Sequence, residues 1–142
     1  MKYYDILIVG AGPVGLFTVF EAGLLGLKCA LVDALDRPGG QCTELYPEKP
    51  IYDIPGVPVQ TAQQHVDALL DQIKPFDYDL YLDNEIITVN KEKENLFVIE
   101  LKSGDFITCG CIFIASGGGK FVPKTPNLDN LDKYENTGFV NY

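Results

Sequence analysis

The sequence predicts an α/β fold built on a parallel sheet, with a small antiparallel β-meander inserted between two of its strands. An apolar run at residues 5–9 leads through glycines into a helical pattern, and a second apolar run follows at 29–32. A third run of the same kind lies at 111–115, after three strand-like segments joined by short polar turns. Uninterrupted apolar runs of this length are typical of strands buried on both faces of a parallel sheet.

The stretch from Asp5 to Asp33 predicts a strand, a helix and a second strand. The apolar run at 5–9 is followed by the letters GAGPVG at 10–15, and Pro13 stands where the first helical turn should begin. Proline is favoured there because that position needs no N–H. Apolar residues then recur as far as Leu27, interrupted by a narrow polar strip, which predicts a mostly buried helix.

Each glycine of the GAGPVG motif has a physical task in binding a dinucleotide. Gly10 permits the tight turn, Gly12 lets the backbone approach a pyrophosphate, and Gly15 lets the helix pack closely. The free N–H groups and the dipole at the helix start attract phosphates. Asp33 ends the second strand, where a carboxylate can accept hydrogen bonds from both ribose hydroxyls. The combination predicts dinucleotide binding; a glycine-rich turn in an ordinary α/β domain is the alternative.

Composition and charge exclude some partners. The 142 residues carry a net charge of −9 and contain no basic run, which argues against nucleic acid or an anionic membrane as partner. Glu21 interrupts the one candidate membrane span before it reaches the ~20 apolar residues that a spanning helix needs. We therefore expect a cytoplasmic protein. The four cysteines show no spacing for a disulfide framework, and none of them belongs to a metal-ligand set, so we expect reduced thiols and no metal site.

The remainder of the chain predicts a long loop, a helix and further strands. Residues 34–58 are rich in Pro, Gly, Tyr and charge and have no clear period, which predicts a long functional loop. Thr61 and Gln64 form a capping-box pattern, which predicts a helix ending before Pro75. The expected strands lie at 77–82, 86–89, 96–101, 106–109 and 111–115.

The loop at 34–58 contains several candidate ligand-binding residues. The paired glycines at 39–40 permit a close backbone approach, and Gln41 offers both a donor and an acceptor to the edge of a heterocycle. Tyr46 and Tyr52 could stack on a ring or pack the loop, and composition alone favours packing.

Three motifs together make the sequence resemble the thioredoxin-reductase-like ferredoxin–NADP reductases. They are GAGPVG at 10–15, GGQ at 39–41 and LYPEKPIYDIPG at 45–56. Thioredoxin reductases share the first two, so the third motif separates the two branches. The resemblance covers essentially the whole chain.

The resemblance implies an FAD site and assigns its residues. Ile86 would lie against the adenine, although without the resemblance it could be a core residue only. Tyr46 would stack on the flavin ring, which reverses the expectation from composition. The implied FAD-binding residues are Gly10, Gly12, Pro13, Gly15, Asp33, Gln41, Tyr46, Ile86, Gly117 and Phe121. No side chain is expected to act as a catalytic acid, base or nucleophile, because flavin chemistry belongs to the cofactor.

The resemblance also implies that residues 1–142 are the N-terminal portion of an FAD-binding domain. The NADPH-binding domain and the C-terminal return of the chain would be absent. The intact protein would be a homodimer passing electrons from NADPH through FAD to ferredoxin or flavodoxin. The alternatives are a thioredoxin reductase, a redox-inactive dinucleotide-binding module and an unrelated α/β domain.

Overall fold

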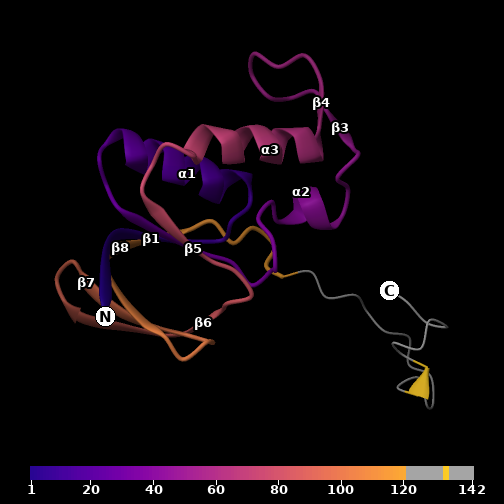
Figure 1. Cartoon of the computed structure of the whole chain (residues 1–142). Coiled ribbons are helices and arrows are strands. Elements are labelled where there is room, and N and C mark those ends of the chain that lie inside the picture. Colours follow the sequence, from indigo (N-terminus) through magenta and orange to yellow (C-terminus); the bar gives the residue numbers. More distant parts are fainter. Residues whose placement is uncertain (121–132, 135–142) are drawn as a thin grey trace.

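The computed structural model describes residues 1–120, 133 and 134, and these form a layered α/β fold (Figure 1). One six-stranded sheet has the order β5-β2-β1-β8-β7-β6, and a separate pair is formed by β3 and β4. The strands are β1 (Lys2–Val9), β2 (Cys29–Val32), β3 (Pro50–Ile51), β4 (Gln60–Thr61), β5 (Tyr78–Tyr81), β6 (Ile86–Lys93), β7 (Leu96–Leu101) and β8 (Phe106–Ile114). The helices are α1 (Pro13–Leu24), α2 (Gln41–Glu44) and α3 (Ala62–Ile73).

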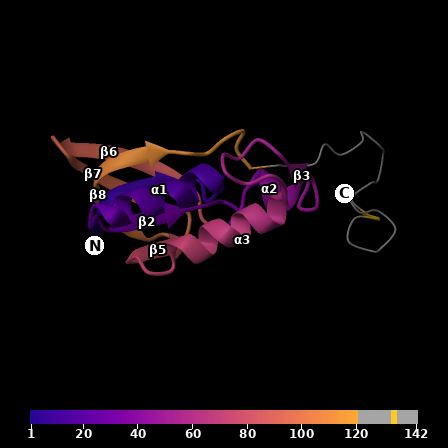
Figure 2. The ribbon, with the colours of Figure 1, turned by 90° about the horizontal axis from the view of Figure 1, so that it is seen from above.

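The sheet is parallel at one side and antiparallel at the other. The strands β5, β2, β1 and β8 run parallel, whereas β7 and β6 pair antiparallel with β8 and with each other. Helices α1 and α3 lie side by side over one face of the parallel part (Figure 2). The predicted α/β class, the parallel sheet and the antiparallel meander are confirmed.

Two apolar cores explain why β1 is apolar from Ile6 to Val9. Ile8 belongs to the core beneath the helices, together with Leu16 and Val66. Its neighbour Leu7 points the other way, into a core shared with Ile99 of the meander. Both are fully buried. Since successive side chains of a strand point to opposite faces, a strand covered on both faces needs an apolar residue at every position.

The capping box predicted for α3 is confirmed. The Gln64 N–H donates to the Thr61 hydroxyl at 3.1 Å, and the Thr61 N–H donates to the Gln64 side chain at 2.8 Å. This reciprocal pair satisfies two of the free N–H groups at the helix start.

A cluster of polar side chains lies beneath the meander and links β1 to β5 by hydrogen bonds. The buried Tyr4 hydroxyl donates to Asp79 at 2.6 Å and lies 2.6 Å from the Tyr81 hydroxyl. Hydrogen bonds from Lys2 and Tyr4 hold the pKa of Asp79 below its usual range. Burial and the Asp79 carboxylate raise the pKa of Tyr4. Tyr4 is therefore neutral and Asp79 ionised at neutral pH.

The structure corrects four sequence-based expectations. The segments at 106–109 and 111–115 form one strand, β8, because β1 pairs with both halves. The second half is not buried: Ile114 is 76% exposed, and among the described residues no strand pairs with its other edge. Helix α1 ends at Leu24 and leaves Val14 and Phe17 exposed, because the sheet and α3 cover only its inner face. The loop at 34–58 contains the short helix α2 and the strand β3.

No helix in the described part of the chain is long and apolar enough to cross a membrane. The four cysteines are free. Burial raises the pKa of Cys29 and of Cys109 to about 11, so both thiols stay protonated at neutral pH.

Candidate dinucleotide-binding site

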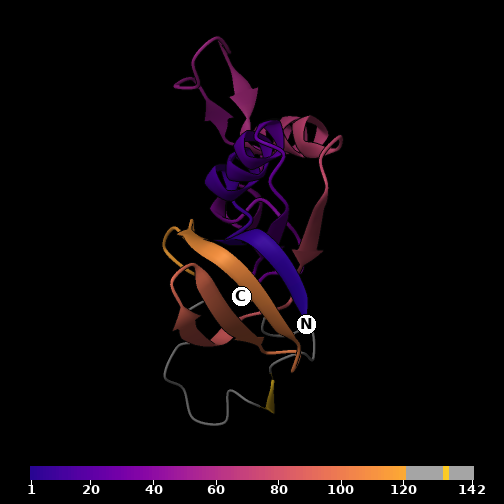
Figure 3. The same ribbon diagram turned by 90° about the vertical axis from the view of Figure 1, so that its left-hand side faces the viewer.

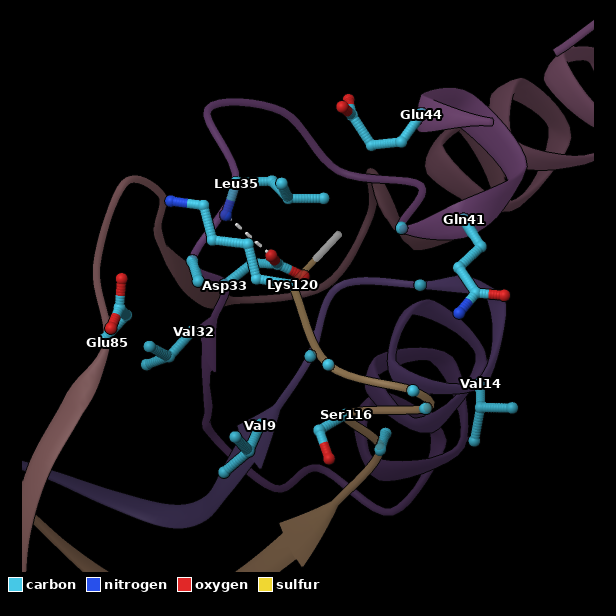
Figure 4. A pocket seen from close by; sticks show the side chains of 18 of the residues that line it. Val9, Val14, Val32, Asp33, Leu35, Gln41, Glu44, Glu85, Ser116 and Lys120 are labelled. Carbon is cyan, nitrogen blue, oxygen red and sulfur yellow. Dashed lines mark hydrogen bonds between the residues drawn. The ribbon is translucent and has the colours of Figure 1, made fainter. Parts of the chain in front are cut away.

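A cavity of about 820 Å³ opens at the carboxyl ends of the parallel strands (Figure 4). Residues directly after β1, β2 and β8 line it, namely Gly10, Asp33 and Ala115. The chain leaves β1 for β2 on one side, whereas β8 lies on the other. Such a change of direction leaves a crevice outside the carboxyl ends of the strands, which is where α/β folds bind ligands.

Gly10 and Gly15 are required by the turn itself. Gly10 has φ +104°, and a Cβ there would lie 2.5 Å from the Ala115 carbonyl oxygen. A Cβ on Gly15 would lie 1.8 Å from the Gly10 carbonyl oxygen, so the helix packs directly on the turn. Gly10 lines the cavity, whereas Gly15 is buried behind it.

No contact or backbone angle within the protein requires glycine at position 12. Its φ of −71° suits any residue, and a Cβ there would meet nothing within 4 Å. It caps the N-terminus of α1, followed by Pro13 in the first turn, and both line the cavity. The space beside Gly12 is therefore open to a ligand at a helix start, where free N–H groups attract phosphates.

The Asp33 carboxylate stabilises the turn through two hydrogen bonds and can accept further ones. One carboxylate oxygen accepts the Ala11 N–H at 2.6 Å, and the other accepts the Leu35 N–H at 2.8 Å (Figure 4). A carboxylate has about four lone-pair sites, so two hydroxyl donors can still be accommodated. This arrangement fits a ribose.

Asn84 and Glu85 line the same end of the cavity and were missed by the sequence reasoning. The buried Asn84 amide donates to the Ser103 hydroxyl at 3.1 Å and accepts the Ser103 N–H at 3.2 Å. Its backbone N–H donates to the Asp33 carbonyl at 2.9 Å. Ile86 follows and also lines the cavity. The one available signal was that residues 84 and 85 follow a predicted strand, where parallel sheets place their sites. We call Asp33, Asn84 and Ile86 the adenosine end.

The far end of the cavity is built from the segment after β2. Gly40 brings the backbone close to the turn, since a Cβ there would lie 3.3 Å from the Gly12 Cα. Gln41 begins α2, and its amide nitrogen lies 2.8 Å from where a Cβ on Gly118 would be. Gly117 lines the cavity with φ +53°. The structure thus places both Gln41 and Gly117 on the wall of this cavity.

Tyr46 lies outside this cavity and lines a second one. That cavity measures about 530 Å³ and shares Gln41 and Cys42 with the first. Tyr46 is 64% exposed and lies on the wall with Lys49. We call Gln41, Tyr46 and Lys49 the ring end. Burial raises the pKa of the Cys42 thiol, which disfavours the nucleophilic thiolate. Phe121 lies outside the described residues.

The charges around the first cavity are mostly acidic. Among the described lining residues, the carboxylates are Asp33, Glu44 and Glu85, and the one ammonium is Lys120 (Figure 4). Glu44 pairs with Arg37 at 2.8 Å and Glu85 with Lys102 at 3.1 Å. Phosphates are best accommodated at the Gly12 helix start, where backbone N–H groups and the helix dipole favour negative charge.

The glycine turn, the helix start and the acid at the end of β2 define a Rossmann-like dinucleotide-binding domain. Residues 4–141 match the pyridine nucleotide-disulphide oxidoreductase family. The chain belongs to that family.

Curated relatives agree with this assignment, and a solved structure shares the fold. The chain is 50% identical over 133 residues to a ferredoxin–NADP reductase of Nitrobacter hamburgensis, covering 94% of this chain and 39% of the relative. It is 51% identical over 138 residues to one of Rhodopseudomonas palustris, covering 97% and 40%. A thioredoxin reductase from Streptococcus pyogenes shares the fold with a TM-score of 0.73 at 19% identity, covering 88% of this chain and 39% of that one. The chain thus spans about two fifths of the length of these proteins.

Proposed function

We propose that this chain is the FAD-binding part of a ferredoxin–NADP reductase, in which electrons pass from NADPH through FAD to ferredoxin or flavodoxin. The observation that carries the proposal is the open space beside Gly12 at the start of α1, within a cavity at the carboxyl ends of β1 and β2. The names of the relatives, each about half identical to this chain, favour this activity over that of a thioredoxin reductase.

The pyrophosphate of FAD would lie against the glycine turn. Gly12 and Pro13 would present the backbone at the start of α1, where N–H groups have no partner within the helix. Gly10 and Gly15 would shape the turn behind it. The helix dipole and these donors would offset the phosphate charge in a cavity that holds more carboxylates than ammonium groups.

The adenosine would occupy the end formed by Asp33 and Ile86. The Asp33 carboxylate, held by two backbone N–H groups, would accept the ribose hydroxyls with its remaining lone pairs. Ile86 would form an apolar wall for the adenine, and Asn84 would hold that wall in place through Ser103.

The flavin would extend along Gln41 toward Tyr46. Gln41 lines both cavities, so a ligand that fills the first can reach the second past it. Gly117 would let the backbone approach the cofactor. When bound, the flavin supplies the redox chemistry, accepting a hydride and releasing electrons singly; the chain's residues bind and orient it.

In the whole protein we propose that a further domain binds NADPH, that the C-terminal part of the chain returns to complete the FAD domain, and that two copies form a homodimer in the cytoplasm. The length of the relatives, of which this chain covers 39%, supports the further domain and the C-terminal return. The homodimer is what the family resemblance implies, and the cytoplasm is the expectation from the sequence.

The test is the visible absorption spectrum of the purified chain after incubation with FAD and desalting. We expect flavin bands to be retained. Titration with FAD, followed by quenching of flavin fluorescence, then gives the affinity. A chain that is folded by circular dichroism but neither retains nor titrates with FAD would refute the proposal for these residues.

A further inference from the structure

A lysine side chain lies over an aromatic ring on the wall of the second cavity. Its wall is formed largely by the segment between α2 and β4, which contributes Tyr46, Lys49 and Tyr52. The β3–β4 ribbon of this segment projects beyond the helices (Figure 3). Tyr46 is 64% and Tyr52 is 70% exposed, so both rings have surface that a flat ligand could bury.

The backbone of Lys49 is held in place although its side chain is exposed. Its N–H donates to the Tyr46 carbonyl at 3.1 Å, and its own carbonyl accepts the Ala62 N–H at 3.0 Å. The neighbouring Gln63 N–H donates to the Pro47 carbonyl at 2.9 Å. These bonds tie the segment to the first turn of α3, so the fold presents Lys49 at a defined place on the cavity wall.

The Lys49 ammonium lies over the Tyr46 ring and has no carboxylate partner in the described part of the chain. It lies 5.9 Å from the ring centroid, within the range of cation–π attraction. Five other described basic side chains form ion pairs, namely Lys2, Lys28, Arg37, Lys74 and Lys102. In a chain with a net charge of −9, Lys49 therefore places on the wall of this cavity a positive charge that is unpaired among the described residues.

Lys49 is also the one basic residue among the described residues that line this cavity, where Asp53 is the one carboxylate. No ion pair joins the two. A charge on a cavity wall acts most strongly on a ligand whose own charge changes, because the interaction is then present in one state and absent in the other.

We propose that Lys49 makes the ring end bind reduced flavin more tightly than oxidised flavin, and so raises the reduction potential of the bound cofactor. The inference rests on the proposed function, since it takes the flavin ring to lie against Tyr46. Hydride transfer from NADPH moves two electrons and one proton to the flavin, leaving NADP⁺ and a flavin that carries one more negative charge. The Lys49 ammonium attracts that added charge.

The test compares three variants of this chain loaded with FAD. Lys49→Met keeps the length of the side chain and removes the charge, and Lys49→Arg keeps the charge. Lys91→Met is the matched control, because the Lys91 ammonium also lies 5.9 Å from an aromatic ring, that of Phe97, and lines neither cavity. The affinity for oxidised FAD is measured by fluorescence titration, and the midpoint potential by spectroelectrochemical titration.

Lys49→Met should weaken binding of reduced relative to oxidised flavin about tenfold, which makes the midpoint potential about 30 mV more negative for a two-electron couple. Lys49→Arg and Lys91→Met should leave the potential within about 15 mV of that of the unsubstituted chain. That difference corresponds to a factor of about three in the relative affinity for reduced and oxidised flavin. A purely structural role for Lys49 would lower the affinity for both redox states equally and leave the potential unchanged.

Two results would overturn the inference while leaving the proposed function intact. One is an unchanged potential in Lys49→Met with FAD bound. The other is an equal decrease in Lys91→Met, which would mean that net charge alone is responsible. If the unsubstituted chain binds no FAD, the proposed function fails as well, so the two failures are distinguishable.

Discussion

The adenosine end and the ring end of the site are built in different ways. At the adenosine end, Asp33 and Asn84 are held by hydrogen bonds to backbone or side chains of three different segments. At the ring end, backbone hydrogen bonds position the segment, but the Tyr46 side chain is 64% exposed. The first end has its geometry before a ligand arrives, whereas the second offers surface that a ligand would cover.

This difference indicates how each end would contribute to affinity. Polar groups that are already oriented lose little freedom on binding, so the adenosine end favours one ligand geometry strongly. An exposed aromatic side chain contributes through apolar area buried and through stacking, which tolerates small shifts of the ligand. Substitutions at the two ends should therefore differ in which fragment of FAD they affect.

The largest effect is expected at the turn that joins the two ends. Gly12→Val should lower the affinity for FAD at least 100-fold, because the added methyl groups fill the space proposed for the pyrophosphate. The free energy of unfolding should change by no more than about 1 kcal/mol, since a Cβ there meets nothing within 4 Å. Fluorescence titration and urea denaturation measure the two quantities.

Gly15→Ala is the matched control for this prediction. Its Cβ would lie 1.8 Å from the Gly10 carbonyl oxygen, so it should destabilise the fold itself. If Gly12→Val unfolds the chain, or binds FAD normally, the space beside Gly12 is not reserved for a ligand.

A smaller effect is expected at Asp33, the carboxylate proposed to bind the ribose. Asp33→Ala should weaken FAD binding by about 1–3 kcal/mol, because charge-assisted hydrogen bonds to the ribose are lost. Direct titration with fragments separates the two ends: ADP should bind Asp33→Ala more weakly than the unsubstituted chain by the same ~1–3 kcal/mol, whereas FMN should bind both with equal affinity. A folded Asp33→Ala chain with unchanged ADP affinity would contradict the ribose role and remove the distinction between the ends.

The smallest effect on affinity is expected at Asn84, the residue proposed to hold Ile86 and the adenine-binding wall in place. Asn84→Ala leaves the Ser103 N–H without its acceptor, which should lower the free energy of unfolding by about 1–3 kcal/mol and the ADP affinity a few-fold. Thr88→Val is the control, because it removes a part-buried hydrogen bond to Glu100 in the same meander without lining the cavity. Equal ADP affinities in the two variants would show that Asn84 contributes only to stability.

Much of the fold followed from local pattern. The apolar runs predicted β1 and β2, the capping box predicted the start of α3, and the polar turns predicted the strands of the meander. These features depend on period, on capping and on turn residues within a few positions of each other, so the order of residues is enough to identify them.

The errors arose where a residue's environment depends on distant parts of the chain. The second half of β8 is as apolar as β1, yet Ile114 is exposed because burial depends on which segments lie on either side. Asn84 is held at the site by Ser103, nineteen residues later, and by its backbone N–H, which donates to the Asp33 carbonyl. Neither fact follows from spacing.

The sequence by itself determined the class of protein, the glycine turn and the acid at the end of β2, since each is specified by residues close together in the chain. Only the tertiary structure decided that Gly12 faces open space, that Gln41 links two cavities and that Lys49 lies over Tyr46 without a carboxylate partner among the described residues. These are relations between segments brought together by the parallel sheet and by α3, and free space and charge pairing are properties of that assembly rather than of any one segment.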